Sequence, residues 1–138
     1  MALLIPDVGE VELLDKLLKD ALAVDENYTL KLYKNDYTPL NSSIAADFTV
    51  ADFDGYVDKT LTRAGWGAAA TVANVAESSY SVEQSWTCNS GTQTIYGYYV
   101  VGATSTVLLW AERFTITRTL AALDQIRITP KFSLRSQN

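Results

Sequence analysis

The chain has 138 residues, 48% hydrophobic and 20% charged, which fits a single folded domain and excludes general disorder. It contains no histidine and one cysteine, Cys88, so a disulfide within the chain, a multi-cysteine metal site and every nucleophile pair that uses histidine are excluded. The net charge of −5 disfavours nucleic-acid binding. The charge is unevenly distributed: residues 1–58 contain twelve acidic and four basic residues, whereas residues 59–138 contain four acidic and seven basic residues.

The first predicted element is a helix near residues 8–24. Asp7 can cap its N-terminus, and Glu10 completes a capping box three residues later. Apolar residues then recur at helical spacing. They are Val11, Leu14, Leu18 and Leu22. We expect residues 1–26 to form a helical arm whose apolar face packs on the chain's own sheet or, alternatively, on a partner.

The start of the chain does not predict export or a membrane anchor. Residues 1–5 are apolar but lack a basic lead, and Pro6 and Asp7 follow them directly. No apolar run reaches the roughly 18 residues that a membrane helix needs. We therefore expect the protein to be made in a cytoplasm and to contact no membrane.

From Tyr28 onward the apolar period becomes two, which is typical of β-strands. The predicted strands cover residues 28–34, 56–62, 70–76, 80–86, 93–101, 107–114 and 125–134, the last interrupted at Pro130, and residues 49–53 are predicted as one helical turn. With about seven or eight short strands and no helix between them, residues 27–138 are predicted to form a mainly β, antiparallel, jelly-roll-like β-sandwich, with one α-helix before it.

The strands at 93–101 and 107–114 predict a β-hairpin with a turn at 102–106, and they are apolar on both faces. Strict alternation assigns Tyr96, Tyr98 and Val100 to one face, and Ile95, Gly97, Tyr99 and Val101 to the other. A sheet with two apolar faces must be covered twice, by its own core and by a second sheet or another subunit. This pattern is more typical of a structural protein than of an enzyme.

The carboxylates of aspartate and glutamate are the only candidate catalytic groups in the sequence. Asp52-Phe53-Asp54-Gly55 resembles the start of a calcium loop, but Val57 and Arg63 stand where the EF-hand template needs glycine and glutamate. We expect turn acids and caps there, with a looser divalent-cation site as the alternative. Cys88 is expected to be a half-buried structural thiol, because no histidine can activate it. No catalytic, cofactor or metal site is predicted.

Six aromatic residues form the candidate set for a subunit or capsid interface. They are Trp66, Trp86, Tyr96, Tyr98, Tyr99 and Trp110. Packing in the core or between subunits explains tyrosine and tryptophan in such strands, and stacking on a carbohydrate is the alternative. The charge asymmetry likewise fits either pairing within the chain or a subunit that docks its acidic face on a basic neighbour.

Five segments also carry a resemblance to a known family, and they occur in the same order. They are Pro6-Asp7-Val8-Gly9-Glu10 with its leucine-rich helix, Leu30-Lys31-Leu32-Tyr33-Lys34-Asn35-Asp36 with Pro39, Phe53-x-Gly55-Tyr56 leading to Lys59-Thr60-Leu61, Gln93-Thr94-Ile95-Tyr96-Gly97-Tyr98-Tyr99-Val100, and Leu109-Trp110-Ala111-Glu112-Arg113-Phe114. The chain resembles a family of small virion structural proteins of tailed bacteriophages and cyanophages, some of which are capsid decoration, or cement, proteins. The likeness covers most of the chain but not residues 115–123.

The resemblance implies a β-sandwich subunit, a homotrimer, on the outer capsid surface of the virion over junctions between major capsid proteins. It implies a protein made in the host bacterial cytoplasm that stabilises the assembled head by clamping its neighbours, with the N-terminal arm or acidic loops on the capsid. A tail or neck component, or a receptor- or carbohydrate-binding module of a phage particle, is the alternative, and a carboxylate-based enzyme is the third class.

Overall fold

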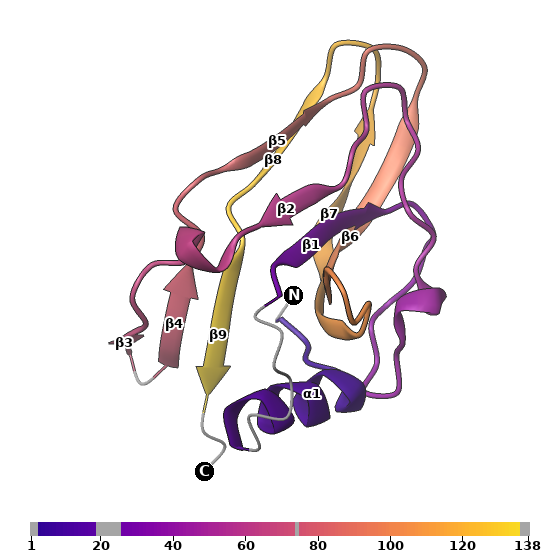
Figure 1. Cartoon of the computed structure of the whole chain (residues 1–138). Coiled ribbons are helices and arrows are strands. Elements are labelled where there is room, and N and C mark those ends of the chain that lie inside the picture. The colour runs from indigo at the N-terminus through magenta and orange to yellow at the C-terminus, as the bar shows by residue number, and fades with distance from the viewer. Residues whose placement is uncertain (1–2, 19–25, 74, 136–138) are drawn as a thin grey trace.

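A computed structural model describes residues 3–18, 26–73 and 75–135 of the chain. The described part is mainly β, with one α-helix near the N-terminus (Figure 1). Its elements are α1 (Asp7–Leu18), β1 (Tyr28–Tyr33), η1 (Ala45–Asp47), β2 (Lys59–Leu61), η2 (Arg63–Gly65), β3 (Ala70–Val72), β4 (Val75–Ser79), β5 (Gln84–Thr87), β6 (Gln93–Gly102), β7 (Leu108–Leu120), β8 (Gln125–Ile128) and β9 (Lys131–Arg135), where η marks a 3-10 helix.

The strands form three antiparallel sheets. The largest has the order β2-β1-β6-β7, the second β3-β4-β9, and the third pairs β5 with β8. In Figure 1 the two smaller sheets extend along one side of the four-stranded sheet. The predicted fold class, an antiparallel sandwich with one N-terminal helix, is confirmed, and the described part holds nine strands.

The main core lies between the four-stranded sheet and the two smaller sheets. Leu30 and Leu32 of β1 are fully buried there beside Trp110 of β7. Trp86 of β5 and Ile126 of β8 close the same cluster from the opposite side. The strand at β1 was predicted from the alternation of these leucines, and that prediction is confirmed because one face of β1 meets this core.

The opposite face of the four-stranded sheet is also buried, as the two-sided apolar pattern predicts. Tyr33, Tyr99 and Leu108 form its core, and the cover is the segment 34–50, which runs across this face and includes η1. Phe48 of this segment stacks on Tyr99, with ring centroids 4.7 Å apart. The second layer is therefore supplied by a loop of the same chain, whereas we expected a second sheet or another subunit.

The face assignment of β6 by strict alternation is wrong at Tyr96. The pairing of β6 with β7 shifts register between Ile95 and Gly97, so residues 114–117 of β7 lie opposite Tyr96 alone. As a result Ile95 lies in the main core with Tyr98 and Val100, whereas Tyr96 packs with Tyr99 and Val101. A bulge of this kind reverses the alternation, and its position depends on the partner strand.

Four other predicted elements are corrected. The helical turn at 49–53 is wrong, because the turn is η1 and Val50 instead pairs with Tyr33 in an isolated bridge. The strand at 70–76 is the hairpin β3-β4, with Ala73 at a φ of 48°. The strand at 80–86 begins only at β5, and Pro130 divides the last strand into β8 and β9, which belong to different sheets.

The N-terminal segment packs on β7, as expected for docking on the chain's own sheet. Leu4 and Ala111 exchange backbone hydrogen bonds, both 3.0 Å long. Gly9 of α1 lies against the carbonyl oxygens of Leu108 and Leu109, and a Cβ at this position would be 2.4 Å from the Leu109 oxygen. The helix ends at Leu18 among the described residues, so the predicted continuation over 19–24 lies outside them. None of the helices described is long and apolar enough to cross a membrane.

Candidate interaction surfaces

Four of the six candidate interface aromatics are buried inside the chain. Trp86, Tyr98, Tyr99 and Trp110 are 2–4% exposed, so their rings are not available to a partner. The other two candidates, Trp66 and Tyr96, are partly exposed, and they make different contacts within the chain. Trp66 packs on the main core, and the ring of Tyr96 lies under the Arg113 guanidinium, 5.2 Å away.

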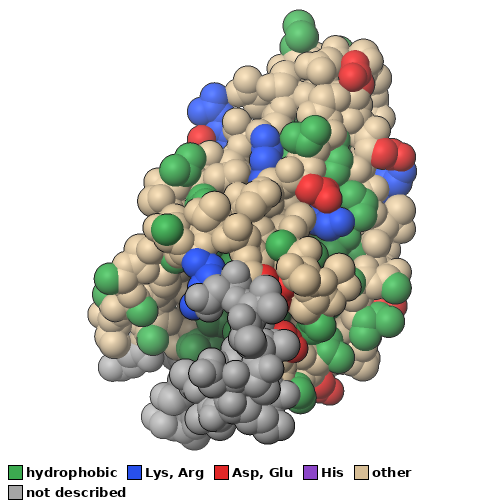
Figure 2. Space-filling model, in the orientation of Figure 1, with side chains coloured by type: hydrophobic (Ala, Val, Ile, Leu, Met, Phe, Trp, Pro, Cys, Tyr) green, Lys and Arg blue, Asp and Glu red, His purple; other side chains and the backbone are tan. Residues whose placement is uncertain are grey.

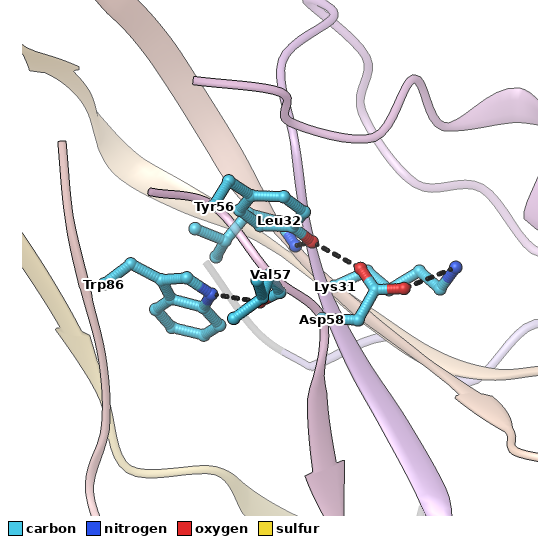
Figure 3. A network of polar contacts seen from close by, with 6 residues as sticks. All are labelled: Lys31, Leu32, Tyr56, Val57, Asp58 and Trp86. Atoms are coloured by element: carbon cyan, nitrogen blue, oxygen red, sulfur yellow. Dashed lines mark hydrogen bonds and ion pairs between the residues drawn. The ribbon is translucent and has the colours of Figure 1, made fainter. Parts of the chain in front are cut away.

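A polar network joins the Phe53-x-Gly55-Tyr56 segment to β1 (Figure 3). The Tyr56 hydroxyl accepts a hydrogen bond from the Leu32 backbone N–H at 3.1 Å and donates one to Asp58 at 2.9 Å. Lys31 lies 3.0 Å from the other oxygen of Asp58. The backbone N–H of Leu32 has no β2 partner because β2 pairs only with residues 28–30. Tyr56 therefore completes the hydrogen bonding of β1.

The same segment also holds β5 against the large sheet. The indole N–H of Trp86 donates to the Val57 carbonyl at 2.7 Å, and the Tyr56 ring stacks on Trp86 with the planes only 9° apart. A buried indole needs such an acceptor. Tyr56 and Val57 thus bridge the two layers of the sandwich, which is a structural role.

Gly97 of the hairpin also has a packing role. A Cβ at Gly97 would be 2.2 Å from the Glu112 carbonyl oxygen and 2.6 Å from the Tyr33 hydroxyl. Such contacts do not occur between real atoms, so only glycine fits where β6 passes between β7 and the Tyr33 ring. Gly97 therefore sits at a position that the fold constrains.

The acids of the loop after β1 are occupied by local contacts. Lys34 and Gln93 each donate a hydrogen bond to the Asp52 carboxylate at 2.6 Å, and these bonds hold the pKa of that carboxyl below its usual range. The Ser90 hydroxyl donates to Asp54 at 2.8 Å. Within the described ranges, no three acidic or cysteine side chains lie close enough together to hold a metal ion.

Cys88 is fully buried in the main core rather than half-buried. Its thiol donates to the Ser90 carbonyl at 3.3 Å. A thiol that is closed to solvent and bonded to backbone acts as a small core residue.

A pocket of about 270 Å3 lies between the sheet of β3, β4 and β9 and the large sheet. Trp66 and Trp110 line it, with their rings edge to face at 5.8 Å, so they do not form a flat platform of the kind that stacks on a sugar. Both indole N–H groups are buried and have no acceptor among the residues described.

An apolar groove lies where the start of α1, η1 and the end of the β6–β7 turn meet. We name it the α1 groove. Its lining is Val8, Ile44, Ala45, Ala46, Thr106, Val107 and Leu108, and its volume is about 310 Å3. Val8 is 39% exposed and Ile44 48%. In Figure 2 apolar and acidic side chains lie next to each other at the lower right, over the start of α1 and η1.

The second exposed apolar feature is on β7. Ile116 is 76% exposed and belongs to the bulge opposite Tyr96. Arg118 and Arg127 line a hollow of about 320 Å3 beside it, together with Glu112. We name Ile116 and Arg118 the β7 knob. Neither this knob nor the α1 groove is predicted from the sequence. The predicted strand ends at residue 114, whereas β7 continues to Leu120 and so includes Ile116.

Comparison with protein-family models finds no match to this chain, and comparison with curated proteins finds none either.

Proposed function

We propose that this chain is a virion structural protein of a tailed phage and that it serves as a capsid decoration protein, which clamps neighbouring major capsid proteins on the outer surface of the head. The observation that carries the proposal is the ordered resemblance of five segments to small phage structural proteins. The structure supports it by giving those segments packing roles: Gly9 lies against β7, Tyr56 bridges two layers and Gly97 fits a close crossing.

The physical basis of a clamp is multivalency. Each copy contributes a weak contact, and contacts repeated over a shell add up without any single strong site. A protein that binds only the assembled shell stabilises it by mass action. A compact sandwich with both faces of its main sheet buried suits this role, because it brings a rigid body to the junction and loses little freedom on binding.

The charge distribution suggests which surface of the protein contacts the capsid. Residues 1–58 carry twelve acids and four bases, and exposed acids among them include Asp7, Glu10 and Asp54. An acidic surface docks on a basic patch of a partner and loses affinity as salt is raised. The acidic loops or the N-terminal segment are therefore the proposed contact with the major capsid protein, and the self-association implied by the resemblance is proposed with it.

The proposal is tested by sedimentation of the purified protein with isolated phage heads. The protein should pellet with expanded heads, at a copy number near that of the major capsid protein, and its release should increase with salt. Unexpanded heads provide the control, because their major capsid proteins do not yet form the junctions that the clamp would bind. Pelleting with tails in a few copies would overturn the proposal in favour of a tail, neck or receptor-binding component. Failure to pellet with either particle would also overturn it.

A further inference from the structure

We propose that the chain associates with a second copy of itself head to tail, with the β7 knob of one copy seated in the α1 groove of the next. This inference deepens the proposed function and rests on it for the role of the assembly. It assigns the self-association to two named surfaces, neither of which contains the six aromatics of the sequence analysis.

The α1 groove is suited to an apolar side chain. All but one of its lining residues are apolar, yet Val8 and Ile44 keep 39% and 48% of their surface in water. Val11 extends the apolar surface along the helix, since residues three apart share a face, and it is 60% exposed. Covering these side chains would remove apolar area from water, which is the main source of affinity at protein interfaces.

Acidic residues lie on α1 and η1, the two elements that form one side of the α1 groove. Asp7 and Glu10 lie in the first turn of α1, and Asp47 ends η1; all three are exposed. Among the residues that the structure describes, none that lines the groove is basic. A partner that fits this site therefore presents an apolar side chain with positive charge beside it.

The β7 knob presents that combination. Ile116 is 76% exposed, and Arg118 is exposed two residues further along the strand. Arg127 lies on the same hollow, where its ion pair with Glu83 is long, at 3.5 Å. Glu112 is the acid of this hollow, and it accepts a hydrogen bond from the Tyr98 hydroxyl at 2.8 Å. The exposed charge next to Ile116 is thus positive.

One copy cannot fill its own groove. Leu108 lines the groove and Ile116 lies eight residues further along β7, which places the two surfaces roughly 25 Å apart at the rise of a strand. Two different patches that complement each other between copies make a heterologous contact, which repeats from one copy to the next. β7 is an edge strand of the large sheet, but its bulge disrupts strand addition there, so side chains carry the contact.

Three aspartate substitutions test the contact by analytical ultracentrifugation. Ile116→Asp alters the knob and Ile44→Asp the groove, and both sites are exposed enough to accept the change. Leu123→Asp is the matched control, because Leu123 is 80% exposed in a turn and has a φ of 73° that aspartate tolerates well. The wild type and the control should sediment as multiples of 15.2 kDa, and the two test variants as 15.2 kDa monomers.

Mixing the two defective variants tests the head-to-tail geometry itself. The Ile116→Asp copy keeps its groove and the Ile44→Asp copy keeps its knob, so together they should form a one-to-one dimer of twice 15.2 kDa and nothing larger. Reversal of charge in Arg118→Glu should weaken wild-type association about tenfold, as for a close interfacial charge. Circular dichroism spectra like that of the wild type establish that each variant is folded.

The proposal is overturned if the wild type remains monomeric up to roughly 100 μM, well above the range of a stable complex. It is equally overturned if Ile116→Asp associates like the control, or if the mixed variants stay monomeric. Head binding separates this inference from the proposed function. A wild-type monomer that still pellets with heads contradicts only the self-contact, and an assembly that ignores heads contradicts only the capsid role.

Discussion

The guanidinium of Arg113 lies 2.6 Å from the carboxylate of Asp36 and donates a second hydrogen bond, of 2.9 Å, to the Tyr37 carbonyl. Arg113 belongs to β7, and both partners belong to the segment that covers the second face of the large sheet. These contacts fasten the cover to an edge strand. They show that the chain closes its two-sided sheet by itself.

Replacement of Arg113 by alanine should loosen that cover. Its side chain is only 18% exposed, and it makes two charge-assisted hydrogen bonds and lies over the Tyr96 ring. We expect the free energy of unfolding to fall by about 1–3 kcal/mol, measured by urea denaturation. Val82→Ala, at a side chain that is 59% exposed and lies outside both proposed contact surfaces, is the control and should change it by less than about 0.5 kcal/mol. Equal effects of the two substitutions would show that the Asp36 contact does not hold the cover.

Phe48→Ala should be among the most destabilising substitutions in the cover. Phe48 is 5% exposed, and its ring packs on those of Tyr33 and Tyr99. Removal of a buried ring leaves a cavity, so we expect a loss of about 3–5 kcal/mol in the unfolding free energy. Val57→Ala, at a side chain that is 58% exposed, is the control. A Phe48→Ala protein as stable as the control would mean that the segment 34–50 does not cover the sheet in solution.

Tyr56→Phe should separate the hydrogen bonds of the Tyr56 hydroxyl from the packing of its ring. The substitution leaves the Leu32 backbone N–H without its acceptor while keeping the stack on Trp86. An unsatisfied donor costs about 1–3 kcal/mol, and we expect thermal unfolding to shift downward accordingly. Tyr96→Phe removes a hydroxyl for which no partner is found among the described residues, and its melting temperature should match the wild type. The prediction fails if Tyr56→Phe melts at the wild-type temperature too.

The buried tyrosines should resist ionisation. Burial raises the pKa of the Tyr99 hydroxyl to about 12, and it raises those of Tyr33, Tyr56 and Tyr98 further. In the unfolded chain, tyrosine hydroxyls ionise near pH 10. The stability that these four hydroxyls contribute is therefore complete below about pH 10, and it falls as the pH rises through the pKa of each hydroxyl in the folded protein. Tyrosinate absorbance should therefore develop in two phases, the second together with loss of circular dichroism.

The contrary result is a single phase. If all eight tyrosines titrate together near pH 10 while the far-ultraviolet circular dichroism is still native, then these four hydroxyl groups are exposed in solution. Tyr99→Phe provides a check, since it should remove part of the second phase and leave the first unchanged.

The sequence predicts the parts of the fold that follow from local pattern. The leucines of β1 alternate cleanly, and α1 begins within one residue of the predicted start, with Asp7, the expected N-cap, as its first residue. The prediction that both apolar faces of the hairpin are covered is confirmed. Strict alternation failed at Tyr96, because the register shift there depends on how many residues β7 places opposite it.

The candidate surfaces could not be predicted for a related reason. Whether Tyr99 faces a partner depends on what covers the second face of the large sheet, and that cover comes from a loop with no periodic pattern of its own. Ile116 becomes a knob only because the bulge projects it, and Ile44 lines a groove only because α1 docks beside η1. Such juxtapositions join residues far apart in the chain, which periodicity cannot reveal.

Imaging of phage heads with and without this protein tests the proposed decoration role. We expect extra density on the outer surface of expanded heads, repeated over the junctions between major capsid proteins and matching the sandwich in size. Density confined to the tail or neck, or heads that look the same in both preparations, would contradict it.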